Sequence, residues 1–262
     1  MKAGFIQTHP ECGKKQSNVQ KAVEFIRNID ADLIVVPELF HSGYVFTSIE
    51  EVEEVSERIP EGYTTQSLID VAGETHSFII AGLAEKADGI FYNSAVLVGP
   101  AGFISVYRKA HLFKDEPKWF TPGDTGFEVC DIGLARVGMM ICFDWIFPEV
   151  ARTLALKGAD IICHPSNLML PYCQKAMITR SIENGVFAIT CNRIGAEEGD
   201  GERLEFTGMS QITDPKGNVL AMASTDKEEA QVVEIDPLEA REKRVGQNSI
   251  FQERRTDLYE LE

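Results

Sequence analysis

Two kinds of hydrophobic pattern alternate along this chain. Short β-rich runs, several of them apolar throughout, are typical of strands that are covered on both faces of a sheet. The chain contains eight such runs: AGFIQ (3–7), DLIVV (32–36), SFIIAGL (77–83), NSAVLVG (93–99), ARVGMMIC (135–142), ADIICH (159–164), GVFAITC (185–191) and QVVEID (231–236). These runs predict a protein built around β-sheet.

Helical patterns lie between several of these runs. After a Ser17–Asn18 start signal, apolar residues fall on one stripe from Val19 to Ile29, and similar patterns cover 65–75, 148–157 and 175–184. The acidic run at 48–62 is interpreted as a solvated helix face. Turn sequences at 99–102 (GPAG) and 214–217 (DPKG) predict hairpins. Helical connections mixed with hairpins indicate an α/β fold with mixed sheets.

The 262 residues show no Pro/Ser-rich linker, low-complexity tract or internal repeat. We therefore expect one domain over 1–262. The C-terminal stretch at 246–262 mixes aromatic and charged residues and is too short to form a domain. We expect this tail to dock on the body of the protein or on a partner subunit.

Composition excludes several classes of partner. The net charge of -16 argues against binding to nucleic acid or to an anionic membrane surface. No window reaches the roughly 18 consecutive apolar residues of a membrane helix, and the N-terminus resembles a first strand more than a signal peptide. Six cysteines without a CxxC pair predict reduced thiols in a cytoplasmic protein and argue against a metal or redox centre.

Reactive side chains stand where three predicted strands end. Glu38 follows DLIVVP, Lys109 follows FISVYR, and Cys142 closes ARVGMMIC. Each could be structural by itself, as a strand-end cap, a lysine reaching solvent or a small core residue. Ligands bind at strand ends in open α/β sheets, so the three could meet in one pocket.

Together these three residue types suit acyl transfer. A thiol attacks as thiolate and needs a base, which a buried glutamate can provide, while a lysine can hold charge on the substrate oxygen. His9, His76 and His111 carry no signature of a nucleophile's partner, and His164 is interpreted as a polar strand-end residue.

The segments VVPELF, YRKAHLF and GMMICFDWIFPE, in this order and spacing, resemble the nitrilase superfamily of carbon–nitrogen hydrolases. HPSN (164–167), RSIENGVFAITCNRIG (180–195) and FTGMSQITDPKG (206–217) are similar to its later blocks. The resemblance implies a four-layer α-β-β-α sandwich and a homodimer formed through helical layers. It also implies that Glu38 is the general base and acid, Lys109 the charge stabiliser, Cys142 the nucleophile and Glu116 a second glutamate bordering the pocket.

The favoured function is an amidase that converts a small aliphatic amide to a carboxylic acid and ammonia through a thioester, with no metal or organic cofactor. Tyr44, Phe143, Trp145 and Asn167 are the candidates for binding substrate. Cys-Phe-Asp at 142–144 resembles the amidase and carbamoylase branches. Asn-Arg-Ile-Gly at 192–195 is similar to carbamoylases that act on carbamoyl-amines, whereas HPSNL (164–168) and CFDW (142–145) resemble small aliphatic amidases of prokaryotes. A nitrile, an ω-amide and an N-carbamoyl amine remain alternative substrates. A non-catalytic scaffold is disfavoured because all three key residues are present.

Overall fold

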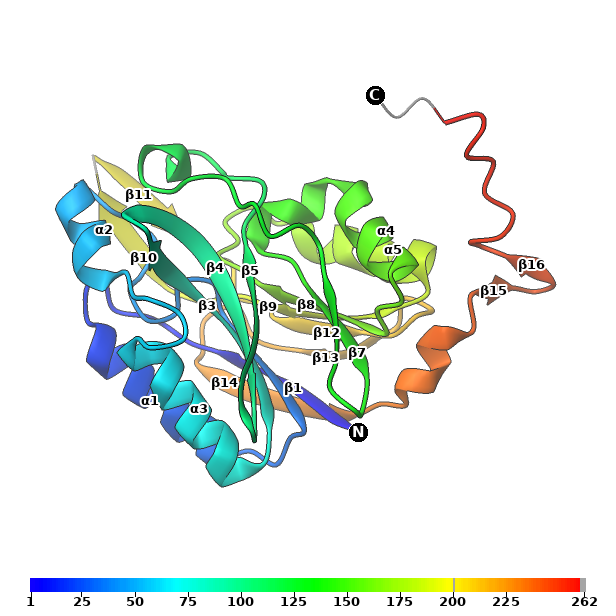
Figure 1. Cartoon of the computed structure of the whole chain (residues 1–262), viewed down its shortest axis with the longest axis horizontal. Helices are drawn as coiled ribbons and strands as arrows, with labels where there is room; N and C mark the ends of the chain where they lie inside the picture. The colour runs from blue at the N-terminus through cyan, green and yellow to red at the C-terminus, as the bar shows by residue number, and fades with distance from the viewer. Residues whose placement is uncertain (200, 260–262) are drawn as a thin grey trace.

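The computed structural model describes residues 1–199 and 201–259. Two six-stranded sheets face each other, and helices cover the outer face of each, as Figure 1 shows with α1 and α3 on one side and α4 and α5 on the other. The predicted α/β class and the four-layer α-β-β-α sandwich with mixed sheets are confirmed.

The first sheet has the strand order β14-β1-β2-β3-β4-β5. Its central pairs, β1–β2 and β2–β3, are parallel, and the pairs at both edges are antiparallel. The hairpin predicted at 99–102 connects β4 to β5. The strands are β1 (Lys2–Gln7), β2 (Leu33–Val36), β3 (Phe78–Ala87), β4 (Ile90–Gly99), β5 (Gly102–Arg108) and β14 (Glu229–Glu234).

The second sheet repeats this plan with the order β13-β12-β9-β8-β7-β6. Here β7–β8 and β8–β9 are parallel, and the remaining pairs are antiparallel. The second predicted hairpin, at 214–217, joins β12 to β13. The strands are β6 (Val129–Asp131), β7 (Arg136–Met139), β8 (Ile161–Pro165), β9 (Phe187–Cys191), β12 (Gln211–Thr213) and β13 (Val219–Met222).

The largest core cluster fills the space between the sheets. Phe5 and Val35 of the first sheet share it with Val137 and Ile189 of the second, and all four are buried. The same cluster continues under α4 (Pro148–Leu156) and α5 (Cys173–Asn184). A separate cluster lies between the first sheet and α1 (Lys15–Arg27) and α3 (Tyr63–Thr75). Apolar runs covered on both faces are therefore a direct consequence of the layered arrangement.

Several predicted boundaries shift. The Ser17–Asn18 start signal is wrong, because α1 begins at Lys15 and the buried Asn18 side chain instead bonds the backbone of Glu11 and His41. In the acidic run only α2 (Ile49–Val55) is helical. A hairpin that the sequence patterns did not predict, β10 (Ala196–Gly199) with β11 (Glu202–Glu205), projects beside the first sheet (Figure 1).

The C-terminal segment leaves the sheets through the 3₁₀ helix η3 (Pro237–Arg241) and a short hairpin, β15 (Arg244–Val245) with β16 (Asn248–Ser249). Phe251 packs against the main core, and the guanidinium of Arg152 lies 5.2 Å from its ring centroid. Docking of the 246–262 tail on a partner stays a prediction, and 260–262 lie outside the described residues.

Across the described ranges, no helix combines the length and the apolar character needed to cross a membrane. The cytoplasmic location stays a prediction.

Candidate active site

Glu38 is held tightly against the neighbouring strand. It comes two residues after β2, and the next residue, Leu39, has a left-handed φ of 48°. Gly82 in β3 exchanges backbone hydrogen bonds with both sides of this turn, donating to Pro37 and accepting from Phe40 at 3.1 Å each. A Cβ on Gly82 would lie 2.5 Å from the Cα of Glu38. Only glycine lets the turn approach this closely.

Lys109 extends from the end of β5 into the same region. Its backbone N–H donates to the carbonyl of Asn93, and its carbonyl accepts from Gly123, both at 2.8 Å. The side chain is fully buried. Its Nζ lies 2.7 Å from Glu38 Oε1 and 2.6 Å from Glu116 Oε1. One ammonium group therefore joins two buried carboxylates.

Cys142 opens the 3₁₀ helix η2 (Cys142–Ile146) beyond the end of β7. The strand stops at Met139, so the thiol stands just past the strand rather than on its last position. Cys142 adopts φ 40°, which costs a residue with a Cβ about 1–3 kcal/mol. Its thiol contacts the carbonyl of Asn167 at 3.7 Å, and its carbonyl accepts from His164 Nε2 at 2.9 Å. Asn167 and His164 thus hold Cys142, the predicted nucleophile, in a strained backbone conformation.

His164 lies in β8 and supports Cys142 from below the turn. The predicted strand-end histidine is fully buried, and burial lowers its pKa to about 4. The neutral ring donates from Nε2 to Cys142, while Nδ1 lies 3.3 Å from the hydroxyl of Thr190. His164 therefore positions the nucleophile's backbone rather than its thiol.

Asp144, the last residue of the Cys-Phe-Asp segment, lines neither of the two pockets next to the site and has a structural role. Its buried carboxylate accepts from the N–H of Ile141 at 2.9 Å, from the hydroxyl of Tyr107 at 2.7 Å and from His111 Nδ1 at 2.7 Å. The acid therefore caps the η2 turn that carries Cys142 and ties it to the end of β5.

Glu116 begins the 3₁₀ helix η1 (Glu116–Lys118) and is almost completely buried. Its Oε1 accepts from the hydroxyl of Tyr44 at 2.9 Å in addition to Lys109, and its Oε2 accepts from the N–H of Phe113 at 3.2 Å. These contacts place Glu116 beside the Glu38–Lys109 pair, as the resemblance implied.

Burial and charge act against each other in this cluster. Burial raises the pKa of Glu116 to about 7, and the Lys109 ammonium only partly offsets the effect. Burial pulls the pKa of Lys109 down, but Glu116 and Glu38 outweigh it and raise that pKa above its ordinary value. Burial followed by the Glu38 charge raises the pKa of Cys142 well above its ordinary value. The resting site therefore holds a charged lysine and a protonated thiol.

Glu38 keeps one oxygen available. Its Oε1 accepts from Lys109 and from the side-chain amide of Asn93, each at 2.7 Å. Its Oε2 is buried and has no hydrogen-bond partner within the described part of the chain. Buried carboxylate oxygens are normally paired, so this oxygen is available to receive a proton.

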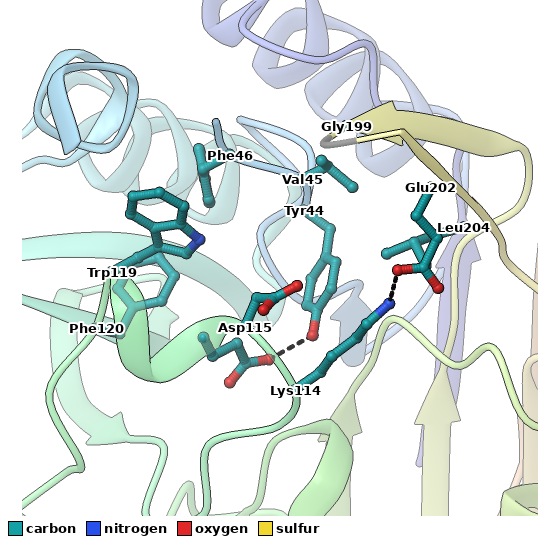
Figure 2. Close-up of a pocket in the computed structure, with 11 residues that line it drawn as sticks. Tyr44, Val45, Phe46, Lys114, Asp115, Trp119, Phe120, Gly199, Glu202 and Leu204 are labelled. Atoms are coloured by element: carbon teal, nitrogen blue, oxygen red, sulfur yellow. Dashed lines mark hydrogen bonds and ion pairs between the residues drawn. The ribbon is translucent and has the colours of Figure 1, made fainter. Parts of the chain in front are cut away.

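Two pockets adjoin the cluster. The polar pocket, shown in Figure 2, contains Tyr44 with its hydroxyl bonded to Glu116 and an ion pair between Lys114 and Glu202 at its edge. Its lining is Tyr44, Val45, Phe46, Lys114, Asp115, Glu116, Trp119, Phe120, Gly199, Glu202 and Leu204. The apolar pocket is lined by Phe113, Cys142, Phe143, Trp145, Ile146, Asn167, Leu168, Met169, Leu170, Tyr172 and Cys173.

Of the four predicted catalytic residues, Glu116 and Cys142 each line one of the two pockets, whereas Glu38 and Lys109 are fully buried and line neither. Glu38, Lys109 and Glu116 are in direct contact, and Cys142 lines the apolar pocket. Of the proposed substrate-binding residues, Phe143, Trp145 and Asn167 line the apolar pocket, whereas Tyr44 lines the polar one. Their catalytic and binding roles stay predictions.

Sequence reasoning missed Asn93, which donates to Glu38 from β4. Its signal was a carboxamide at the start of the apolar run NSAVLVG, where an amide must find a buried partner. Within 1–199 and 201–259, no group of three His, Cys, Asp or Glu side chains is arranged to hold a metal ion. Between Glu38 and Glu116, the ammonium of Lys109 takes the place that a cation would occupy.

The four-layer sandwich with mixed sheets is the fold of the nitrilase superfamily of hydrolytic enzymes, and a solved member of that superfamily from Saccharomyces cerevisiae superposes on this chain with a TM-score of 0.80 at 26% identity, covering 92% of both chains. The family model for carbon–nitrogen hydrolases matches residues 2–245. This chain belongs to the carbon–nitrogen hydrolase family.

Similar proteins carry different activities in their names. The chain is 50% identical to a nitrilase of Pyrococcus abyssi over 99% of both chains. It is 37% identical to an (R)-stereoselective amidase of a Pseudomonas species, over 90% of this chain and 85% of that one. A crystal structure of a carbon–nitrogen hydrolase from Helicobacter pylori superposes with a TM-score of 0.89 at 29% identity, covering 99% of this chain and 96% of that one.

Proposed function

We propose that this protein is an amidase that hydrolyses a small aliphatic amide to a carboxylic acid and ammonia through a thioester on Cys142. The observation that carries the proposal is the buried Glu38 carboxylate. One of its oxygens is held by Lys109 and Asn93, and the other has no partner among the described residues. Such a group can accept a proton and later return it.

In the first half of the reaction, Glu38 Oε2 takes the proton of the Cys142 thiol as sulfur attacks the amide carbon. Because the pKa of this thiol is raised, the proton transfer must accompany the attack rather than precede it. The oxyanion is stabilised by the Lys109 ammonium and by the N–H of Phe143, which lies in the first turn of η2 and so has no partner within that helix.

Collapse of the tetrahedral intermediate breaks the C–N bond, and Glu38 gives its proton to the departing ammonia. A water molecule then gives a proton to Glu38 and attacks the thioester carbon, and the returning proton restores the thiol as the acid leaves. Lys109 remains charged throughout, because the adjoining carboxylates hold its pKa above the ordinary value despite burial.

Pocket chemistry favours a neutral acyl group. No charged side chain lines the apolar pocket within the described residues, so the carboxylate of an ω-amide would be buried there without a cation. The Pyrococcus nitrilase supports a nitrile as the second candidate, in which attack gives a thioimidate before nitrogen leaves. An N-carbamoyl amine remains a third.

Parallel measurement of ammonia release separates these candidates. We expect turnover of propionamide to exceed that of a dinitrile, glutaramate and N-carbamoylputrescine. Mass spectrometry of rapidly quenched enzyme should find the acyl group on the peptide that contains Cys142. An adduct on Cys163, or turnover of the nitrile alone, would contradict the amidase proposal.

We also infer a homodimer in which helices α4 and α5 pack against their counterparts. Leu156 on α4 and Ile182 on α5 are 44% and 49% exposed. These helices therefore offer apolar surface that a second subunit could cover. Light scattering after gel filtration should give about twice the 29.1 kDa chain mass. A mass of one chain would exclude this arrangement.

A further inference from the structure

A buried ion pair lies behind the active site and takes no part in the mechanism described above. Arg193 is completely buried, and its guanidinium pairs with Glu197. The other two guanidinium nitrogens each donate one hydrogen bond, Nη2 to the carbonyl of Pro10 at 3.1 Å and Nε to the carbonyl of Ile194 at 3.3 Å. Burying two charges costs several kcal/mol for each ion, so such a pair is weak support for stability and calls for another explanation.

Glu197 connects this pair to the active-site loop. Its Oε2 accepts from two consecutive backbone N–H groups, that of Tyr44 at 2.9 Å and that of Val45 at 2.8 Å. Its Oε1 is the atom that faces Arg193. The two carboxylate oxygens therefore have separate tasks, one toward the buried cation and one toward the loop.

The fit between Glu197 and the loop is close. Gly43 has a left-handed φ of 84°, and a Cβ at this position would lie 2.8 Å from Glu197 Oε1. Phe206 supports the same loop from the side: its ring is 6.0 Å from that of Tyr44, edge to face, and 4.2 Å from the guanidinium of Arg193. Tyr44 is thus held through its backbone and through its ring.

The other end of Tyr44 reaches the catalytic cluster. Its hydroxyl donates to Glu116 Oε1 at 2.9 Å, and the same oxygen is 2.6 Å from Lys109 Nζ. A short chain of contacts therefore runs from Arg193 through Glu197 and Tyr44 to Glu116.

We propose that Glu197, held by Arg193, is a positioning residue that sets the place of Tyr44 and through it the alignment of Glu116 on Lys109. The inference rests on the proposed function, because Lys109, which contacts Glu116, acts on the substrate there. Misplacing a catalytic group by about 1 Å can cost on the order of a hundredfold in rate.

A double-mutant cycle tests this connection. Wild type, Glu197→Gln, Tyr44→Phe and the double variant are compared by kcat and KM for the best substrate. The new carboxamide would turn its N–H donors toward either Arg193 or the loop, so we expect Glu197→Gln to lower kcat/KM roughly tenfold to a hundredfold. In the Tyr44→Phe background the same change should cost less than about threefold, because the hydroxyl that Glu197 positions is gone.

Glu198→Gln is the matched control. Glu198 is exposed, and within the described chain its one ion pair is with Arg203, at 3.4 Å. The kcat/KM of the Glu198→Gln variant should therefore stay within about twofold of wild type. An equal loss from Glu197→Gln in both Tyr44 backgrounds, or no loss, would overturn the proposal. If Glu197→Gln does not fold, the pair Arg193→Met with Glu197→Gln removes both buried charges and takes its place in the cycle.

A crystal structure of the Glu197→Gln variant, or of the Arg193→Met, Glu197→Gln double variant, tests the positioning role of Glu197 separately from the proposed amidase activity. The positioning role requires the contact between Tyr44 and Glu116 to lengthen, whatever the substrate is. A wild-type enzyme that hydrolyses no amide would contradict the amidase proposal alone, whereas an unchanged Tyr44–Glu116 contact would contradict the positioning role alone.

Discussion

Cys142 in the turn after β7 and Cys163 in the adjacent strand β8 are both buried, but their backbones and surroundings differ. Cys163 sits in the middle of β8, where it pairs with Met139 of β7, three residues before Cys142. Both side chains are buried, and burial raises the pKa of both thiols. For Cys163 burial is the only cause, whereas Cys142 also interacts with the charges of Glu38, Lys109 and Glu116.

This comparison shows that burial does not decide which cysteine can react. Cys163 has extended backbone within a ladder of hydrogen bonds, while Cys142 stands past the strand with a φ of 40° and a base nearby. The strand end frees the thiol from sheet neighbours, and the facing sheet supplies the charges. In the proposed mechanism, the reactivity of Cys142 therefore comes from the meeting of the two sheets and not from the cysteine's own segment.

The largest expected effect comes from removing the two sulfur atoms in turn. Cys142→Ala should abolish turnover, because no other nucleophile stands beside Glu38 and Lys109 in the proposed mechanism. Cys163→Ala should keep kcat near that of wild type and lower the free energy of unfolding by roughly 1 kcal/mol. Steady-state assays and urea unfolding of both variants measure this. Full activity in Cys142→Ala would remove the basis of the comparison.

Lys109→Met tests the effect of a charged neighbour that influences Cys142 but not Cys163. We expect kcat/KM to fall by about 10²–10³-fold with the loss of a charge stabiliser. The two carboxylates left without a cation should also lower the free energy of unfolding by roughly 3–5 kcal/mol. Lys114→Met is the control, because Lys114 pairs with Glu202 at the edge of the polar pocket. Equal losses in both variants would show that the buried position of Lys109 has no special role.

Gly82→Ala tests how closely the base must approach. The added Cβ would meet the Cα of Glu38 at 2.5 Å, so the turn must move, and we expect kcat/KM to fall by about a hundredfold. Gly73→Ala adds the same methyl group to α3, where the nearest atom is the carbonyl oxygen of Pro100 at 3.8 Å. That variant should be fully active and stabilised by roughly 0.5–1 kcal/mol. Thermal unfolding and kinetics distinguish the two glycines.

The smallest expected effect is a pair of opposite pH slopes. As pH rises through about 7, Glu116 ionises and strengthens its contact with Lys109, so activity should increase. Stability should move the other way. The folded state raises this pKa from 4.5 to about 7, so it binds more protons than the unfolded chain in that window, and the contribution to the free energy of unfolding falls as pH rises.

Glu116→Gln removes this titration. Urea unfolding at about pH 5 and about pH 7.5, on either side of the Glu116 pKa, should show a smaller decrease with pH in the variant than in wild type. The same decrease in both proteins would assign the slope to other groups.

Most strands of the two six-stranded sheets, four helices, two hairpins and the cluster residues could be predicted because they rest on local patterns and on an ordered set of motifs. The short strands β6, β15 and β16 were not predicted. Asp144 could not be placed from sequence, since its partners Tyr107 and His111 come from a segment that lies 37 and 33 residues earlier. The β10–β11 hairpin was missed because its residues, AEEG and ERLE, carry neither apolar alternation nor β-branched side chains.

Helix α1 was misjudged at its start for a related reason. Asn18 resembles a cap in sequence, but its amide satisfies the backbone of two distant loop residues, Glu11 and His41. Tertiary contacts of this kind override a local signal. The positioning contacts of Glu197 are invisible in sequence for the same reason, because Tyr44 and Glu197 are 153 residues apart.

The pairing of β14 with β1 bears on how the protein is synthesised. The ribosome has made Glu38, Lys109, Glu116 and Cys142 once residue 142 emerges, yet the first sheet still lacks its edge strand, which is supplied by Glu229–Glu234. The amino group of Met1 is tied to the carbonyl of Ile235 at 2.8 Å. A nascent chain must therefore keep its first strand unpaired on one edge until residues 229–234 have been translated. Contacts of such long range fold slowly, so the first sheet is completed well after the residues of the candidate site have been made.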